Sequence, residues 1–351
     1  MSALTALTVS ARPEEDTTLR PVPWQRMVWV TWRQHRTALT GVAALLMGLA
    51  ALLWIVGLQL HHAYAATTTC RPASSIVCGS LINTFNGVGG FLANGGILQV
   101  VPALIGAFVG APVLARELES GTVRYAWTQG FGRMRWTLAK LVGLGVVVTV
   151  GAGALSILTS WYFEPYFATG NQSLGLTELN PLAPGLFDLR GVAFAAWTLG
   201  AFAIGALAGT LIRRVVPAIV ATLALYAALA VATGGWLRQH YLAPLVRNTL
   251  TVPGSAWIVS QHWTTNGGRP VSQSVIDQVL LRAPSTVVGK GGIPKSFAVT
   301  QYLMRHGYTQ LTSYQPASRF WAFQWIEGGW LLALSVLLIA VTVWLVRRRA
   351  V

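Results

Sequence analysis

The chain has 351 residues, of which 54% are hydrophobic and only 10% are charged, whereas soluble proteins average roughly 25% charged residues. The formal net charge is +15. The basic residues lie beside long apolar stretches instead of forming a polar binding face, which argues against a nucleic-acid partner and indicates a membrane protein.

The first 23 residues are polar and contain proline and the acidic run Glu14, Glu15 and Asp16. They have no apolar core of the kind found in a cleavable signal peptide. We therefore expect residues 1–23 to be a disordered cytoplasmic tail.

Residues 24–36 combine tryptophans with arginines. The apolar members recur at helical spacing and the basic members occupy other positions: Trp24, Met27, Val28 and Trp32 against Arg26, Arg33 and Arg36. This pattern predicts a helix lying in the membrane interface, with tryptophan at the level of the lipid headgroups. The alternative is a simple N-terminal extension of the first membrane span.

Six stretches contain no charged residue over about the thickness of a membrane. A helix needs about 20 mostly apolar residues to cross the roughly 30 Å hydrocarbon layer. The stretches are 37–60, 97–115, 141–163, 191–212, 215–237 and 328–346. They predict a polytopic membrane protein with six transmembrane helices, the first five within residues 37–237 and the last within 328–351.

The basic residues predict how these helices are oriented, since short cytoplasmic loops carry an excess of Lys and Arg. One set of helix ends holds fourteen of them: Arg20, Arg26, Arg33, Arg36, Arg116, Arg124, Arg133, Arg135, Lys140, Arg213, Arg214, Arg347, Arg348 and Arg349. The opposite short loops, 61–96 and 164–190, hold only Arg71 and Arg190. Both termini are therefore expected in the cytoplasm, with the basic residues contacting lipid headgroups.

The chain's two cysteines, Cys70 and Cys78, fall in the first loop on the opposite side. An oxidising compartment would permit a disulfide between them, which we favour over free thiols. A metal site is disfavoured because only His61 and His62 lie nearby as further ligands, and we expect no metal.

Small residues recur four positions apart inside two of the predicted spans, as Gly106 with Gly110 and Gly205 with Gly209. Such pairs let two helix backbones approach closely. We favour packing within the chain over a contact between subunits.

The loop 116–140 is too large for a simple turn and carries two acids, a Gly-Thr break and exposed aromatics. Arginine and aromatic residues are enriched at protein contact surfaces, so we expect a docking surface. The residues concerned are Glu117, Glu119, Gly121, Thr122, Arg124, Tyr125 and Trp127. The alternative, a basic loop that only sets topology, explains the arginines but not the acids or the aromatics.

Residues 238–327 form a long segment on the outer side, punctuated by Pro and Gly. Two amphipathic helices are expected there, one capped by Ser272 and one over 295–306, so we predict a small extracytoplasmic subdomain.

The run 289–296 resembles a phosphate-binding loop, but Pro294 stands where glycine is required. We therefore expect no nucleotide binding at this run.

The remaining acids near the membrane edges are Glu164, Asp188 and Glu327. Acids in such positions are usually solvated or paired with arginine, and Arg190 and Arg319 are the nearby candidates in the sequence. No group of these residues has recognisable catalytic spacing, so no catalytic residue is assigned and the chain is not expected to be an enzyme.

The run Arg116-Glu117-Leu118-Glu119-Ser120-Gly121-Thr122, just after the second of six spans, resembles the signature of ABC-2-type exporter permeases. The tryptophan- and arginine-bearing N-terminal helix is similar to the family's connecting helix, and the run 314–321 is similar to actinobacterial members. The resemblance implies that the loop contacts a cytoplasmic ATP-binding subunit, through Glu117, Glu119, Gly121 and Thr122 and on to Arg124, Tyr125 and Trp127. It also implies a second permease copy, identical or related. One departure is that the outer segment is longer than the two short helices usual in the family.

The expected fold is therefore an all-α integral membrane fold of the ABC-2 exporter type, with an interfacial helix and an outer subdomain. The expected function is the permease subunit of an ATP-driven exporter in a bacterial cell membrane. Uncharged spans suit a hydrophobic or amphipathic cargo such as a drug, antibiotic, lipid or peptide. The chain itself would bind no cofactor, with ATP and Mg on the partner subunit. The alternatives are a polytopic membrane enzyme and an ATP-independent carrier, although a carrier would usually keep ionisable residues near the middle of the membrane.

Overall fold

The computed structural model describes residues 24–70, 76–93, 96–121, 133–168, 180–248, 255–284, 287 and 296–349. Within these ranges, six helices are long and apolar enough to cross a membrane: Trp29–Thr69, Leu98–Ser120, Met134–Ala168, Gly191–Ile212, Val215–His240 and Ala317–Arg348. We number them span 1 to span 6. Each predicted stretch coincides with one of them, apart from a residue or so at the start of span 2, which confirms the mostly helical, six-span architecture.

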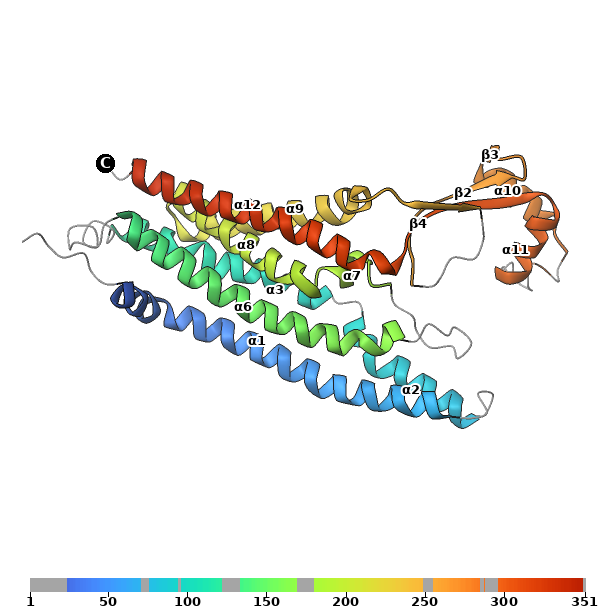
Figure 1. Ribbon diagram of the computed structural model, residues 1–351, viewed down its shortest axis with the longest axis horizontal. Coiled ribbons are helices and arrows are strands. Elements are labelled where there is room, and N and C mark those ends of the chain that lie inside the picture. The colour runs from blue at the N-terminus through green and yellow to red at the C-terminus, as the bar shows by residue number, and fades with distance from the viewer. Residues whose placement is uncertain are drawn as a thin grey trace, which may run out of the picture.

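The spans run side by side along the long axis of the molecule (Figure 1). Their helical elements, with the short helices that join them, are α1 (Trp24–Thr69), α2 (Ile76–Ala93), α3 (Gly96–Ile105), a π-helical turn (Gly106–Gly110), α4 (Pro112–Ser120), α6 (Arg133–Ala168), α7 (Pro184–Phe187), α8 (Gly191–Ile212), α9 (Val215–Ala232), a second π-helical turn (Thr233–Leu237), two 3₁₀ turns (Arg238–His240 and Ala317–Arg319) and α12 (Phe320–Arg349). Span 2 therefore consists of α3, the first π turn and α4.

The residues predicted to form an interfacial helix, 24–36, are helical and continuous with span 1. These residues are the first turns of α1, a single helical element of 46 residues. The two faces of this segment differ, because Met27 and Thr31 are buried while Trp29, Trp32 and Arg33 are exposed. The position of these turns in the membrane interface stays a prediction.

Helix α8 lies at the centre of the bundle and packs against α6, α9, α12 and all three parts of span 2. Its sequence is dominated by Gly and Ala, and fifteen of its 22 residues are buried. Small side chains allow neighbouring helices to approach closely on every side. This composition explains why α8, and not a span with larger side chains, occupies the central position.

The glycines of span 2 face those of α8. A Cβ atom on Gly205 would lie 2.3 Å from the carbonyl oxygen of Gly106, and a Cβ on Gly209 would lie 2.3 Å from that of Ala111. In the other direction, a Cβ on Gly110 would lie 2.5 Å from the carbonyl oxygen of Phe202. The prediction of glycine packing within the chain is confirmed.

The π turn in span 2 lies at this contact. The N–H of Ala111 donates to the carbonyl of Gly106 at 2.9 Å, five residues back. Pro112 follows directly, and a proline ring crowds the carbonyl four residues before it. Widening the turn by one residue relieves that crowding while keeping the backbone hydrogen bonded.

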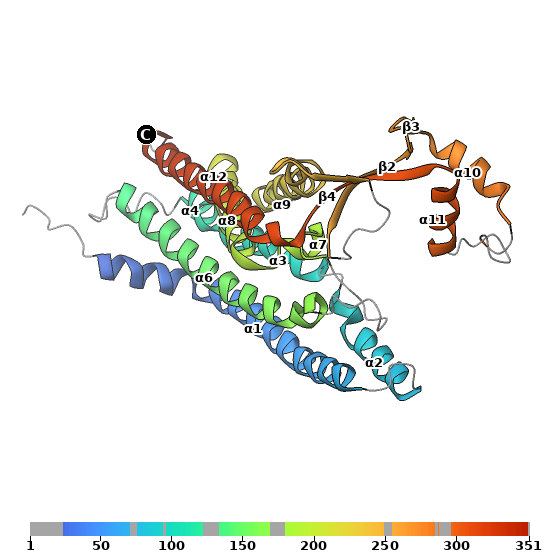
Figure 2. The same ribbon diagram turned by 45° about the vertical axis from the view of Figure 1, so that its right-hand side comes forward.

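The outer segment contains a sheet that the sequence analysis did not predict. Its strands are β1 (Leu245–Asn248), β2 (Trp257–Thr265), β3 (Pro270–Val271) and β4 (Tyr308–Gln315), in the order β1-β4-β2-β3 with antiparallel pairing. β2 and β4 pair from Trp257↔Gln315 to Thr265↔Tyr308, with an irregularity between Ile258 and Ser260. Together they form a long ribbon that projects beyond the helices (Figures 1 and 2). An all-α description is therefore wrong for this segment.

Both predicted amphipathic helices are present near the far end of the ribbon, as α10 (Gln273–Leu281) and α11 (Ser296–Arg305). Ser272 occupies the N-cap position of α10, but its hydroxyl contacts the hydroxyl of Ser274 at 2.9 Å and makes no capping hydrogen bond. The predicted boundaries of the segment also need correction. Arg238 at one end and Phe320 to Glu327 at the other belong to the membrane helices.

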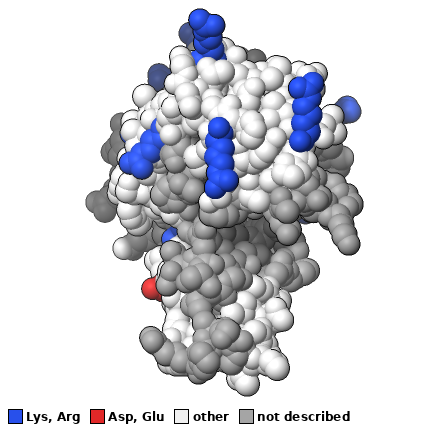
Figure 3. All heavy atoms as spheres, turned by 90° about the vertical axis from the view of Figure 1, so that its right-hand side faces the viewer, with Lys and Arg blue, Asp and Glu red and all other residues white. Residues whose placement is uncertain are grey.

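The two ends of the bundle differ in charge. The end opposite the ribbon carries the exposed residues Arg33, Arg36, Arg116, Arg213, Arg214, Arg347 and Arg348, and we call it the basic end. The ribbon-bearing end also has exposed arginines, Arg247, Arg269, Arg282 and Arg305, all in the long outer segment. In Figure 3, the Lys and Arg side chains on this face stand apart from one another, and an acidic side chain is also visible. The predicted charge asymmetry along the helices is thus present in the described residues.

Replacing Gly205 by Ala should destabilise the bundle by about 1–3 kcal/mol, because the added methyl would meet backbone atoms of span 2 that cannot turn aside. The matched control is Gly143→Ala in span 3, where a Cβ would meet nothing within 4 Å and helix propensity favours Ala. The measurement is the thermal unfolding midpoint of each purified variant in the same detergent. Equal midpoints for the two variants would contradict the glycine contact described here.

Candidate functional site

Of the predicted coupling residues, Glu117, Glu119 and Gly121 lie at the basic end, where span 2 ends. Helix α4 stops at Gly121, which has a φ of 69°. Glycine is favoured there because other residues rarely adopt the left-handed region. Thr122, Arg124, Tyr125 and Trp127 lie outside the described residues.

Glu117 is turned toward the bundle and not toward the exterior. Its carboxylate forms an ion pair with Lys140 of α6, whose side chain is almost wholly buried. The Lys140 ammonium also lies 3.9 Å from the centre of the Trp136 ring, a favourable cation–π distance. This pair ties the end of span 2 to the start of span 3.

Glu119 is engaged in a different way. Its Oε2 atom accepts the N–H of Val215 at 3.0 Å, at the first residue of α9. A carboxylate at a helix N-terminus satisfies a free backbone donor and interacts favourably with the helix dipole. The preceding Arg213 makes the tight turn out of α8 with a φ of 58°. Glu119 therefore ties span 2 to span 5 at this turn.

Of the residues assigned to the N-terminal helix, Trp32 and Arg33 are exposed on α1, and the Arg33 guanidinium lies 5.4 Å from the Trp29 ring. Trp24 and Arg26 lie in the first turn of α1, and their side chains are outside the described set. The structure does not bring Trp32 or Arg33 into contact with the two acids.

Cys70 and Cys78 are joined by a disulfide, with their Cα atoms 5.8 Å apart. The bond connects the end of α1 to the start of α2, at the end of the bundle that bears the ribbon. His61 instead stacks on Trp161, with ring centres 4.5 Å apart, and its Nε2 lies 3.0 Å from the Trp161 carbonyl. Among the described residues, no group of three or more metal-ligating side chains gathers.

A second polar cluster, at the ribbon end, was not assembled by the sequence analysis. Arg238 is fully buried and donates from Nε and Nη2 to the two carboxylate oxygens of Glu327, at 2.9 and 2.8 Å. Nη2 also contacts Asp188. Asp188 and Glu327 were expected to be solvated or paired with Arg190 or Arg319, so pairing with arginine is correct but the arginine is a different one.

The two arginines first considered have other partners. The Arg190 guanidinium lies over the rings of Phe167 and Phe320, at 4.1 and 4.8 Å. Arg319 donates to the Ala243 carbonyl and to Gln315, at 2.7 and 2.6 Å. Arg238 could have been noticed in the sequence as a charge at the end of an apolar stretch, but nothing in its spacing indicates Glu327 as its partner.

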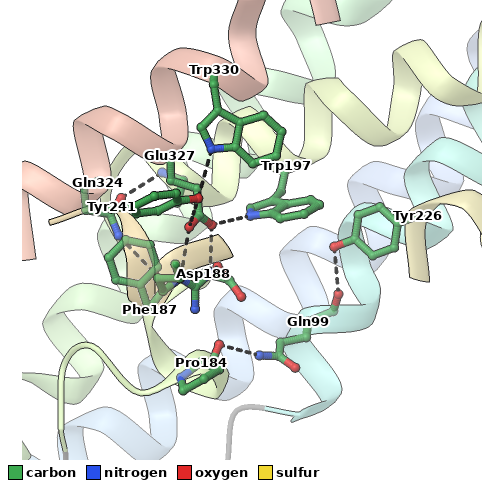
Figure 4. Close-up of polar contacts among 12 residues, drawn as sticks. Gln99, Pro184, Phe187, Asp188, Trp197, Tyr226, Tyr241, Gln324, Glu327 and Trp330 are labelled. Carbon is green, nitrogen blue, oxygen red and sulfur yellow. Dashed lines mark hydrogen bonds and ion pairs between the residues drawn. The ribbon is translucent and has the colours of Figure 1, made fainter. Parts of the chain in front are cut away.

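Aromatic donors complete the shell of Glu327 (Figure 4). The indole N–H of Trp197 donates to Oε1 at 2.9 Å, and the hydroxyl of Tyr241 donates to Oε2 at 3.1 Å. The indole of Trp330 in turn donates to Tyr241 at 2.9 Å. Buried charges are tolerated when they are both paired and hydrogen bonded, and Glu327 meets both conditions.

A cavity of about 690 Å³ lies beside this cluster, between α3, α7, α8, α9 and the second π turn. Its lining is mostly apolar, with the side chains of Gln99, Asp188 and Tyr226 as polar exceptions. Gln99 donates to the carbonyl of Pro184 at 3.1 Å. Concave, mostly apolar cavities of this size with a few polar groups are typical of small-molecule sites.

Replacing Arg238 by Met should destabilise the protein by about 3–5 kcal/mol, because Glu327 would remain buried without its counter-charge. The control Arg305→Met removes an exposed arginine and should change stability by no more than about 0.5 kcal/mol. Thermal unfolding in detergent measures both. Adding Glu327→Gln to Arg238→Met should recover part of the loss, and a double variant no more stable than Arg238→Met alone would argue against the pairing.

A family model described as "ABC-2 membrane transporter related" matches residues 43–238, more than half of the chain. Neither a functionally described protein nor a solved structure matches the chain. The matched region begins in span 1, includes Glu117, Glu119 and the glycine contact, and ends at Arg238. The chain therefore belongs to the ABC-2 membrane transporter related family and is a multi-pass membrane protein of the transporter class.

Proposed function

We propose that this protein is the permease subunit of an ATP-driven exporter of a hydrophobic or amphipathic compound, powered by a separate ATP-binding subunit. Two six-span chains, identical or related, would enclose the path. The membrane would be a bacterial cell membrane, and the basic end would face the cytoplasm, because basic residues concentrate on that side of a membrane. Family membership supports the class of transporter.

The observation that carries the proposal is the attachment of the cytoplasmic end of span 2 to its neighbours. Glu117 ties it to span 3 through Lys140, and Glu119 ties it to span 5 through the N–H of Val215. A displacement of the end of span 2 therefore cannot remain local, since it acts on the ends of three spans. An ATP-binding subunit that moves the loop on closing would thereby move the bundle.

The structure supports a changed role for the two acids. They were expected to contact the ATP-binding subunit directly, yet both have partners within the chain. In the proposed mechanism they transmit motion into the helices, and the contact surface consists of the residues that follow, namely Thr122, Arg124, Tyr125 and Trp127. The apolar cavity beside α9 supports the proposed class of cargo.

The test of function is purification of the tagged full-length chain from its native membrane. We expect an ATP-binding protein, labelled by a photoreactive ATP analogue, to co-purify with it, and ATP hydrolysis to elute with the complex. The same chain produced alone in a heterologous host should hydrolyse no ATP. ATP hydrolysis by the lone chain, or its transport activity without a nucleotide-binding partner, would overturn the proposal.

The test of coupling uses Glu117→Gln and Glu119→Gln in that complex. Each variant should retain the ATP-binding subunit but reduce ATP-dependent transport at least about tenfold, because each loses an attachment between span 2 and a neighbouring span, and a tenfold change corresponds to about 1.4 kcal/mol. Glu164→Gln, an exposed acid at the other end of α6, is the control and should transport normally. Normal transport in both loop variants would remove the proposed role. Loss of the ATP-binding subunit from these variants would instead favour direct contact between the two acids and that subunit.

A further inference from the structure

The acidic side chains beside the cavity outnumber the basic ones. Two carboxylates, Asp188 and Glu327, share the single guanidinium of Arg238, and Glu327 takes two of its hydrogen bonds. Glu327 is fully buried, but the Asp188 side chain is 24% exposed and lines the cavity. One negative charge in excess therefore faces the cavity when both acids are ionised.

Aromatic side chains stand on the same side. Trp197 and Tyr226 line the cavity and pack edge to face, with ring centres 5.5 Å apart. The carboxylate of Asp188 is turned toward the side on which Tyr226 and Gln99 stand (Figure 4). A carboxylate beside aromatic faces attracts a cation, through its charge and through the ring quadrupoles.

The rim of the cavity is apolar. Val100, Leu223 and Val231 line it and are also exposed on the surface of the bundle. A small inorganic cation would lose its hydration shell there, with only Gln99, Asp188 and Tyr226 as polar lining side chains. An organic cation with an apolar body would instead bury apolar surface while its charge meets Asp188.

We propose that this cavity binds an organic monocation with an apolar body, and that Asp188 provides its counter-charge. The proposal names the cargo class for the exporter function given above and rests on it for the role of the site in transport. Anions are disfavoured, because Arg238 is fully buried and already engaged by two carboxylates. A neutral lipid would not explain a carboxylate at this position, because it carries no charge for Asp188 to balance.

The proposal has a consequence for pH. Burial raises the pKa of Asp188 to about 8, with Glu327 adding to the effect and Arg238 opposing it. Tyr226 and Tyr241 are the other titratable groups near the cluster. Only the ionised carboxylate attracts a cation, so a bound cation displaces a proton. Cation affinity should therefore weaken as the pH falls through about 8.

The experiment compares two probes of the same shape and opposite charge, tetraphenylphosphonium and tetraphenylborate. Binding of each to the purified full-length chain in detergent is measured by equilibrium dialysis, without any ATP-binding subunit. Tetraphenylphosphonium should bind at least tenfold more tightly, and its affinity should rise between about pH 6 and about pH 9. Asp188→Asn should lower its affinity at least tenfold and abolish the pH dependence. Glu164→Gln should change neither.

Tyr226→Leu provides a second test that leaves the charge cluster intact, and it should weaken the cation alone. Equal binding of the two probes, or unchanged cation binding in both Asp188→Asn and Tyr226→Leu, would overturn the proposal and leave an apolar or lipid-filled cavity. Because no ATP-binding subunit is present, failure here leaves the exporter function standing. Conversely, failure to find such a subunit would leave the binding result intact.

Discussion

The backbone contact between span 2 and α8 is the interaction on which the other features depend. Gly106, Gly205 and Gly209 bring the two helices so close that a single methyl group would meet backbone atoms. Span 2 carries Gln99 of the cavity at one end and Glu117 and Glu119 at the other. With α8 against its middle, span 2 physically joins the two candidate sites, and its π turn lies at the contact with α8.

The surroundings inside the bundle have a low dielectric constant, and the ionised side chains there are therefore paired. Glu117 has Lys140, and Glu327 has Arg238. Such pairs persist because breaking one leaves a buried charge without compensation. Asp188 differs, because it shares its arginine with Glu327 and also faces a cavity. Glu117 and Glu327 are therefore suited to stabilising the structure, whereas Asp188 is available to a ligand.

Sequence reasoning succeeded where a single local property decides the outcome. The length of an uncharged apolar stretch predicted all six spans, since backbone groups in lipid must be satisfied within a helix. Amphipathic spacing predicted α10 and α11. The sheet was missed because β2 and β4 are separated by more than 40 residues that include both helices, and pairing over that distance has no local pattern. The continuity of residues 24–36 with span 1 was not evident either, because nothing local marks whether a helix continues into the next span.

The sequence by itself determined the membrane class, the number of spans, the asymmetry of charge and the presence of an acidic segment after span 2, because composition and hydrophobic length act over a few neighbouring residues. Only the tertiary structure decided what the acids contact. Glu117 and Lys140 are 23 residues apart and Arg238 and Glu327 are 89 apart. Their pairing results from the way the helices pack around α8. Packing brings together charged side chains that are far apart in the sequence and excludes water from between them.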